Sequence, residues 1–207
     1  MARPREFDED AVLDAAVQCF WSRGFEATSI KNLIGRTGLT AASLYNAYGD
    51  KRGLFRTALD RYVEGSIGER IRRCEALPPR EGISTFFDDI LDRSLKDRER
   101  KGCMLVNSAL EVAPHDPEFR DAIAAVLFRL ESFFLSRIVA GQETATITST
   151  RTADVHARHL LGVLIGVRVL ARVCPERALL EGVIAPALGL LDVGVATQPA
   201  SGSDGRP

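Results

Sequence analysis

TSIKNLIGRTGLTAASLYNAYGDK, residues 28–51, predicts two short helices separated by a tight turn. Thr28 is expected to cap the first helix, because threonine side chains accept hydrogen bonds from free N–H groups at helix starts. Gly38 permits the positive φ that a tight turn requires. Thr40 is expected to cap the second helix, which ends at Gly49. The stretch therefore predicts a compact pair of helices rather than one continuous helix.

Two short helices around a glycine turn, braced by a third, form a helix-turn-helix unit, whose second helix lies in the major groove of DNA. Small residues at the start of that helix allow a close approach to a phosphate. Tyr45 and Tyr48 lie three residues apart and share a helix face, and Asn46 has an amide suited to adenine. On spacing alone, both tyrosines are equally well explained as half-buried aromatic residues. The phosphate-contact candidates are Thr28, Lys31, Ala41, Ala42, Ser43, Tyr45, Tyr48 and Lys51.

The sequence around this unit supports a nucleic-acid surface at one end of the protein. The formal net charge of the chain is −1, yet residues 23–56 contain six basic and only two acidic side chains. Local positive charge on a near-neutral chain is typical of a DNA-binding face. Arg3 and Arg5 precede it on an N-terminal arm. Charge alone is also compatible with a solvated helix surface.

The rest of the chain has helical periodicity throughout, which predicts an all-α fold. Asp8 is expected to cap a bracing first helix that ends at Gly24, and Asp50 a long fourth helix towards Cys74. LPPREG (77–82) is the clearest break. Further helices are expected at 83–98, 102–112, 117–139, 152–173 and 176–192. We divide the chain into a helix-turn-helix DNA-binding domain (1–50), a helical effector-binding and dimerisation domain (51–193) and a disordered tail (194–207).

The segment GFEATSIKNLIGRTGLTAASLYNAYGDKRGLF resembles the N-terminal DNA-binding domain of the TetR/AcrR family of transcriptional regulators, over roughly Phe7 to Phe55. The resemblance implies an all-helical homodimer, usually a repressor that leaves a palindromic double-stranded DNA operator when a small-molecule effector binds. It also implies that Tyr45 and Lys51 contact phosphates. By the same resemblance, the residues near base edges are Thr40, Ala41, Ala42 and Asn46.

The last two helical segments are expected to form the homodimer. DVHARHLLGVLIGVRVLARV (154–173) is apolar nearly all round its later half, and its two glycines stand four residues apart on one face. With RALLEGVIAPALGLLDV it can form half of a four-helix bundle across a twofold axis. The alternative is that both helices belong to the core of a monomer. The interface candidates are His159, Gly162, Gly166, Leu179 and Leu190.

The middle helices carry the candidates for effector binding or sensing, which are Phe86, Phe87, Cys103, Asn107, Phe128 and Arg168. Phenylalanines at helical spacing are also explained as ordinary core. RKGCMLVNSALE (100–111) resembles a TetR subgroup with a Gly-Cys pair opening the sixth helix, similar to the N-ethylmaleimide-responsive repressor. In some of those regulators the cysteine reacts with electrophiles. The alternative is that Cys103 is a small buried hydrophobic residue.

The composition argues against catalytic, metal and membrane functions. The four cysteines are widely spaced, and the three histidines have no visible nucleophile partner. We therefore expect no cofactor, no metal site and no enzyme activity, and the free thiols suit a cytoplasmic location. The longest apolar run is interrupted by Arg168 and is too short to span a bilayer. Alternatives are an activator of the same fold, or an all-helical small-molecule-binding protein or enzyme whose N-terminal unit docks protein.

Overall fold

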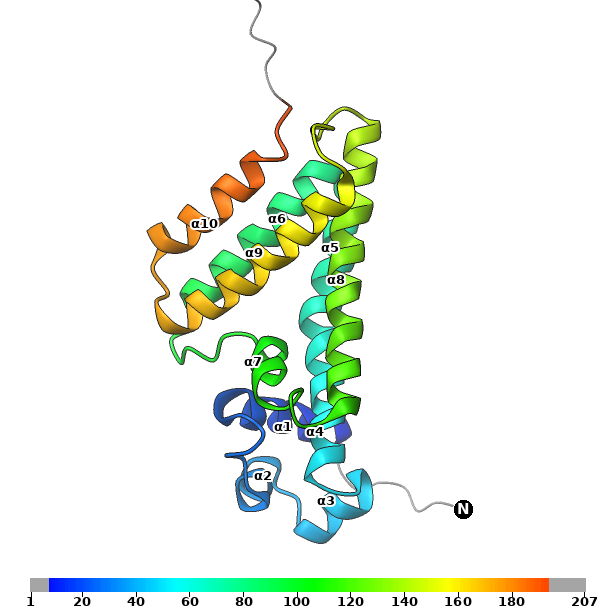
Figure 1. The fold of residues 1–207 in the computed structure, drawn as a ribbon. Helices are drawn as coiled ribbons and strands as arrows, with labels where there is room; N and C mark the ends of the chain where they lie inside the picture. The colour runs from blue at the N-terminus through cyan, green and yellow to red at the C-terminus, as the bar shows by residue number, and fades with distance from the viewer. Residues whose placement is uncertain (1–7, 194–207) are drawn as a thin grey trace, which may run out of the picture.

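The computed structural model describes residues 8–193, which contain helices and no strand. This confirms the expected all-α fold. The helices are α1 (Glu9–Arg23), α2 (Ile30–Thr37), α3 (Ala41–Tyr48), α4 (Lys51–Tyr62), the π-helix η1 (Val63–Gly68), α5 (Glu69–Glu75), α6 (Pro79–Lys96), α7 (Met104–Glu111), α8 (Pro117–Glu143), α9 (Ala153–Val173) and α10 (Arg177–Gly189). In Figure 1, α2 and α3 form one end of an elongated molecule.

Three of the predicted helix caps are confirmed. Asp8 accepts a hydrogen bond from the N–H of Ala11 at the start of α1, and Thr40 from that of Ser43 at the start of α3. Asp50 caps α4 through the N–H of Gly53. Gly38 lies between α2 and α3 with a φ of 72°, as its position in the turn predicts.

The predicted cap of α2 is wrong by one residue. Ser29 is the cap: its hydroxyl accepts a hydrogen bond from the N–H of Asn32, and its own N–H donates to the Asn32 side chain, which completes a capping box. Thr28 is fully buried, and its hydroxyl donates to the Gly24 carbonyl at 2.6 Å. Thr28 therefore closes the end of α1 instead of opening α2.

The expected long fourth helix is present, but it is interrupted by a π turn. α4, η1 and α5 follow one another without a break from Lys51 to Glu75. π turns are rare and are frequently found at functional sites. Because α4 packs against α1 and α3 and then continues into α5, one helix runs through both parts of the molecule. The domain division after residue 50 stays a prediction.

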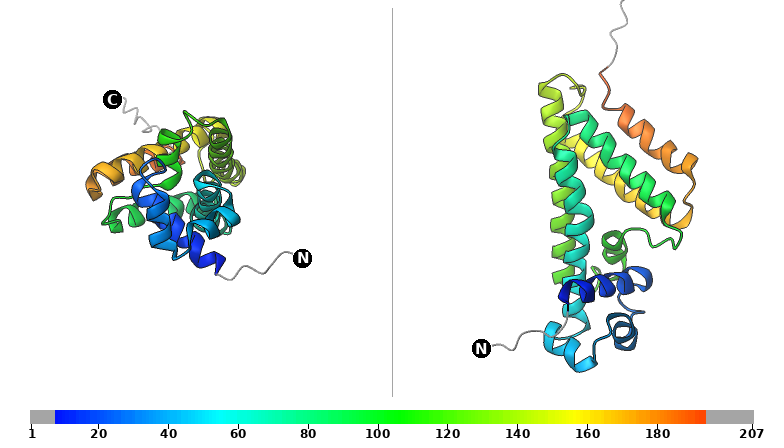
Figure 2. Two further views of the ribbon diagram at one scale, coloured as in Figure 1. Left: turned by 90° about the horizontal axis from the view of Figure 1, so that it is seen from below. Right: turned by 180° about the vertical axis from the view of Figure 1, so that it is seen from behind.

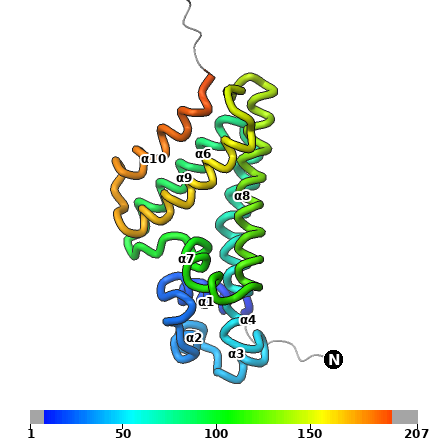
Figure 3. The backbone as a smooth tube through the Cα atoms, viewed as in Figure 1, coloured from blue at the N-terminus to red at the C-terminus, as the bar shows by residue number. Residues whose placement is uncertain are grey.

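The remaining helices build a bundle around an aromatic core. The view from behind in Figure 2 shows α8 running beside the α4–α5 rod, and Figure 3 shows α10 at the outer edge next to α6 and α9. α6 starts earlier than expected because Pro79 occupies its first turn, where a missing N–H has no consequence. Phe86, Phe87, Phe133 and Phe134 pack ring against ring at centroid distances of 5.2 to 6.1 Å.

Within residues 8–193, no helix combines the length and the apolar character that crossing a bilayer requires. Arg3, Arg5 and the tail at 194–207 lie outside the described residues.

Candidate nucleic-acid interface and effector cavity

The exposed face of α3 carries most of the residues expected to face DNA. Leu44 is 3% exposed and anchors the helix, which turns the opposite side to solvent. Tyr45 is 45% exposed, and the other side chains on the α3 surface are small or uncharged. Also exposed are Thr40, Ala42 and Asn46, while Ala41 and Ser43 are half-buried. α3 can therefore present its start and its tyrosine to a duplex.

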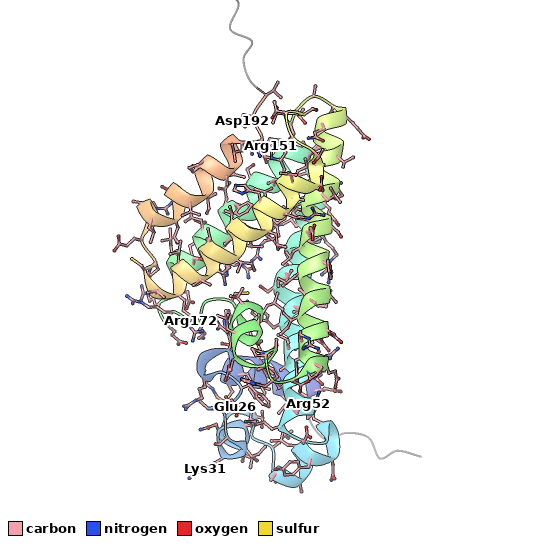
Figure 4. The ribbon with its side chains drawn as sticks, in the orientation of Figure 1. Glu26, Lys31, Arg52, Arg151, Arg172 and Asp192 are labelled. Atoms are coloured by element: carbon pink, nitrogen blue, oxygen red, sulfur yellow. The ribbon has the colours of Figure 1, made fainter. Side chains whose placement is uncertain are left out.

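The two lysines beside this face have different environments. Lys31 is exposed at the α2 end of the molecule (Figure 4). Lys51 is half-buried: its ammonium group donates to the Phe25 carbonyl at 2.9 Å and lies 4.2 Å from the centre of the Phe25 ring. Lys51 therefore ties the start of α4 to the loop after α1, in addition to any contact with a phosphate.

Two expected phosphate contacts need correction. The Thr28 hydroxyl is buried and already donates to Gly24, so it does not face solvent. Tyr48 is half-buried against the core, and its hydroxyl oxygen is inaccessible to solvent. Tyr48 is thus a packed, half-buried aromatic residue, which was the alternative interpretation of its spacing. The spacing of the two tyrosines does not reveal this, because it fixes a shared face but not the depth of each ring.

A carboxylate clamp joins the helix-turn-helix unit to the rest of the protein. Glu111, at the end of α7, accepts hydrogen bonds from the N–H of Phe25 at 3.1 Å and from that of Glu26 at 2.8 Å. A Cβ on Gly24 would lie 2.6 Å from the Glu111 carboxylate, and Gly24 also has a φ of 85°. The loop after α1 is therefore shaped to receive Glu111.

A second junction joins α4 to the start of α8, where Arg52 is labelled in Figure 4. The Arg52 guanidinium donates to both oxygens of Asp116, at 2.7 and 3.0 Å, and to Glu118 at 2.6 Å. These contacts, together with the backbone N–H groups that Asp116 caps, lower the pKa of Asp116 to about 2. The α8 start thus holds α4 by charge as well as by packing.

A cavity of about 320 Å³ lies between the α4–α5 rod and α6, α7, α8 and α9. Its walls are largely apolar and include Ile67, Phe86, Leu130 and Leu164. Trp21 of α1 reaches the same cavity, and its indole N–H donates to the Gly102 carbonyl at 3.2 Å. The cavity therefore touches both the helix-turn-helix domain and the helical bundle.

Three of the expected effector-site residues line this cavity: Phe86, Cys103 and Arg168. Arg168 donates to the Ser94 hydroxyl at 2.9 Å and to the Gly102 carbonyl at 2.6 Å. Cys103 is 7% exposed, and the Tyr62 hydroxyl donates to its sulfur at 3.6 Å. Burial and the neighbouring Cys103 raise the pKa of Tyr62, so its hydroxyl keeps its proton.

The other three expected effector residues lie elsewhere. Asn107 is outside the cavity, and its side-chain amide donates to the Lys101 carbonyl. Phe87 is fully buried in the aromatic core, as the alternative predicted. Phe128 is 67% exposed on α8, because its position points away from the bundle.

Sequence reasoning missed Trp21, Tyr62 and Arg70 as cavity residues. In the sequence, only Arg70 could have drawn attention to this site, because it interrupts the otherwise regular apolar stripe of the long helix.

The expected dimer residues lie on an exposed face of α9 and α10. On α9 this face repeats every three or four residues and is apolar apart from His159; its members are Val155, His159, Gly162, Gly166, Val169 and Val173. No atom of residues 8–193 lies within 4 Å of a Cβ placed on Gly162 or Gly166. Leu179 of α10 is 37% exposed, and Leu190, which directly follows α10, is 52% exposed. The described part of the chain therefore leaves this face uncovered.

Comparisons with known proteins agree with this architecture. Residues 12–58 match the family model for bacterial regulatory proteins of the tetR family, and residues 79–185 match the tetracyclin repressor-like C-terminal domain. The uncharacterized HTH-type transcriptional regulator YezE of Bacillus subtilis (strain 168) is 32% identical over 93% of this chain and all of its own length. The HTH-type transcriptional repressor ComR of Escherichia coli (strain K12) is 32% identical over 58% of this chain and 59% of its own.

Solved structures show the same relationship. A cysteine-substituted variant of the TetR family regulator CifR, in complex with a 26-bp double-strand operator DNA, superposes with a TM-score of 0.81. It is 30% identical and covers 92% of this chain and 100% of its own. An exposed short helix behind a glycine turn, a helical bundle with an internal cavity, and both family matches lead to one conclusion: this chain belongs to the TetR family of transcriptional regulators.

Proposed function

We propose that this protein is a homodimeric repressor that binds a palindromic operator through α3 and releases it when a small molecule occupies the central cavity. One observation carries the proposal. The same helical rod starts beside α3 at Lys51 and lines the cavity with Tyr62, Ser66, Ile67 and Arg70. A ligand that moves this rod therefore moves α3. Two relatives in Escherichia coli, ComR and BdcR, are named transcriptional repressors, which favours repression over activation.

The mechanism is a shift between two dimer geometries. A palindromic operator requires its two reading helices one DNA turn apart, about 34–36 Å. A ligand that fits only one orientation of the rod selects that orientation, because a ligand shifts an equilibrium by its difference in affinity for the two states. The π turn at Val63–Gly68 lies beside the cavity and is the natural place for the rod to adjust.

The test is selection of DNA fragments from a random pool by the full-length protein, followed by binding measurements at several salt concentrations. A symmetric sequence and a steep loss of affinity with salt are expected, because several phosphates are neutralised. The double substitution Tyr45→Ala and Lys51→Ala should abolish binding while sedimentation still shows a dimer. Parental affinity in that variant, or salt-independent binding, would favour the rival in which the N-terminal unit docks protein.

Cys103 is a second point at which a signal can enter. It lines the cavity directly before α7, the helix whose far end carries the Glu111 clamp. An electrophile attached to its sulfur would occupy the cavity and press on α7. We propose that the protein senses electrophiles in this way in the cytoplasm, as expected for the subgroup that resembles the N-ethylmaleimide-responsive repressor. Operator release by a quinone should be lost in Cys103→Ser, and an equal response in both proteins contradicts it.

A further inference from the structure

The cavity contains an excess of positive charge that its own residues do not neutralise. Among its lining residues, one carboxylate, Asp97, faces five cationic side chains: Arg70, Arg93, Lys96, Lys101 and Arg168. Asp97 is already used, since it accepts a hydrogen bond from the N–H of Gly102 at 2.9 Å. Lys96 and Lys101 pair with Asp92 and Glu99. The three arginines therefore outnumber the one carboxylate, Asp97, that lines the cavity with them.

Arg70 is the most unusual of these groups. Its side chain is 4% exposed, and it makes no hydrogen bond with any described residue. The nearest carboxylate, Asp89, is 3.7 Å from its Nε and also pairs with Arg73. Arg70 lies against the Phe86 ring, 5.4 Å from its centre. Burying a guanidinium without hydrogen-bonded partners is costly, so an arginine at this place requires an explanation.

The environment of Arg70 disfavours its charged form. Burial, which has the largest effect, and the neighbouring charges of Arg93 and Arg168 together lower its pKa to about 10. Arg168 has two hydrogen bonds, to Ser94 and Gly102, but both partners are neutral. The buried guanidinium of Arg70 and the half-buried one of Arg168 therefore line the same cavity, and neither has a hydrogen-bonded carboxylate partner among the described residues. An added negative charge would relieve the repulsion between them and supply acceptors for both.

We propose that the cavity binds an organic anion, an apolar body with a single carboxylate that faces Arg70 and Arg168. This inference rests on the proposed function, since it names the chemical class of the effector. A volume of about 320 Å³ and walls of Ile67, Phe86 and Leu164 suit a small apolar body. A single carboxylate matches the planar fork of an arginine. A multiply charged ligand would lose more hydration than these walls could replace.

The anion site is also connected to the DNA-binding domain. The Gly102 carbonyl accepts hydrogen bonds from Arg168 and from the indole of Trp21. A carboxylate that draws the Arg168 guanidinium towards itself weakens its hold on this carbonyl and changes the environment of Trp21. Since Trp21 belongs to α1, the charge of the ligand reaches the helix-turn-helix unit by two hydrogen bonds that share one acceptor.

Trp21 is the only tryptophan of the chain, so its fluorescence reports directly on the cavity. Naphthoate and octanoate would be titrated into the full-length protein beside their neutral amides and octylamine. The two acids separate aromatic from aliphatic bodies, and each amide keeps the shape of its acid while removing the charge. The acids should bind at least about tenfold more tightly than their amides, the size expected for charge-assisted hydrogen bonds.

Three variants assign the preference to Arg70. Arg70→Met, which fits the apolar wall, should reduce the acid-to-amide ratio to about one, and Arg70→Lys should restore part of it. Arg72→Met is the matched control, because Arg72 lies on the same helix but is 61% exposed and pairs with Glu64. It should keep the full ratio. Thermal melting would verify that each variant is folded.

Several results would overturn the inference. Amides or octylamine that bind as tightly as the acids exclude an anion site, as does an unchanged ratio in Arg70→Met. A panel with no effect on Trp21 fluorescence excludes it too. Selection of an operator by the unliganded protein is measured separately. The regulator assignment can therefore fail while the acids bind, and the anion site can fail while the protein still selects an operator.

Discussion

At the scale of single residues, Lys31 and Lys51 show that equal charge near the DNA face does not imply an equal role. Lys31 is exposed and makes no hydrogen bond or ion pair with any residue of the described range 8–193. Lys51 holds the Phe25 carbonyl and ring. The first lysine is available for a phosphate alone, whereas the second also maintains the position of the loop after α1.

Lys31→Met and Lys51→Met should therefore separate DNA affinity from stability. Lys31→Met should weaken operator binding without changing the melting temperature. The slope of log affinity against log salt concentration should become shallower by about one, because one fewer phosphate is neutralised. Lys51→Met should weaken binding and also destabilise the protein by about 1 kcal/mol, since a hydrogen bond and a cation–π contact are lost. Denaturant unfolding and fluorescence anisotropy measure both. Equal unfolding free energies in the two variants would contradict this assignment.

At the scale of elements, the junctions between helices are made by charged side chains that grip backbone or capping groups. Glu111 binds two N–H groups of the loop between α1 and α2, and Arg52 binds the cap of α8. Such contacts are directional, so a shift of α7 or α4 is transmitted to the helix-turn-helix unit rather than absorbed by sliding side chains.

Glu111→Ala should uncouple the two parts of the protein. Loss of two charge-assisted hydrogen bonds at a partly exposed site should reduce the free energy of unfolding by about 1–2 kcal/mol. Effector binding should persist, but its effect on operator affinity should shrink. Glu111→Gln retains one acceptor and should be intermediate. Ligand titrations of DNA complexes measure the coupling, and a variant with full ligand response would exclude Glu111 as a coupling residue.

The Arg52–Asp116 pair predicts how stability depends on acid. The pKa of Asp116 is depressed from an ordinary value of 3.8 to about 2 in the folded chain. Its contribution to stability is therefore complete above about pH 4 and is lost as the pH falls towards 2. Asp116→Asn should melt at a lower temperature than the parent near neutral pH, and this gap should close in that acidic window. A gap that is constant with pH in calorimetric scans would show that the ion pair contributes nothing.

At the scale of the whole molecule, the uncovered face of α9 and α10 is the feature that a single chain does not explain. Its glycines have open space where a side chain would project, and valines on the same face are 41% to 71% exposed. Helices with such a face are stable in water when a second copy covers it. The twofold arrangement would also present two copies of α3 to one duplex.

Gly166→Glu should convert the protein to a monomer. A Cβ at this position meets no atom of residues 8–193, so the fold should be kept, while a charge is placed in the centre of the proposed interface. Operator affinity should fall at least about a hundredfold, because linked binding of two half-sites is lost. Leu110→Glu is the control, an equally drastic change at a site on α7 that is 72% exposed. Sedimentation that still shows a dimer for Gly166→Glu would place the interface elsewhere.

The order of the helices and the helix-turn-helix unit follow from the sequence, because caps, glycine turns and helical periodicity are local properties. Asp8, Gly38, Thr40 and Asp50 act within three or four residues of their position, and each is confirmed. The α2 cap was displaced by one residue because Thr28 and Ser29 are both competent caps. Only the contact of Thr28 with Gly24 distinguishes them.

Amino-acid order alone determined an all-α chain with a helix-turn-helix unit near its start, since these features depend on neighbours in sequence. Tertiary structure decided which side chains meet across the fold. It placed Phe128 outside and Arg70 inside, directed Glu111 to the loop at Phe25, and brought Trp21 to the cavity. The reason is that burial and partnership depend on how helices far apart in sequence are rotated and packed, and helical periodicity gives each helix a buried face without naming what covers it.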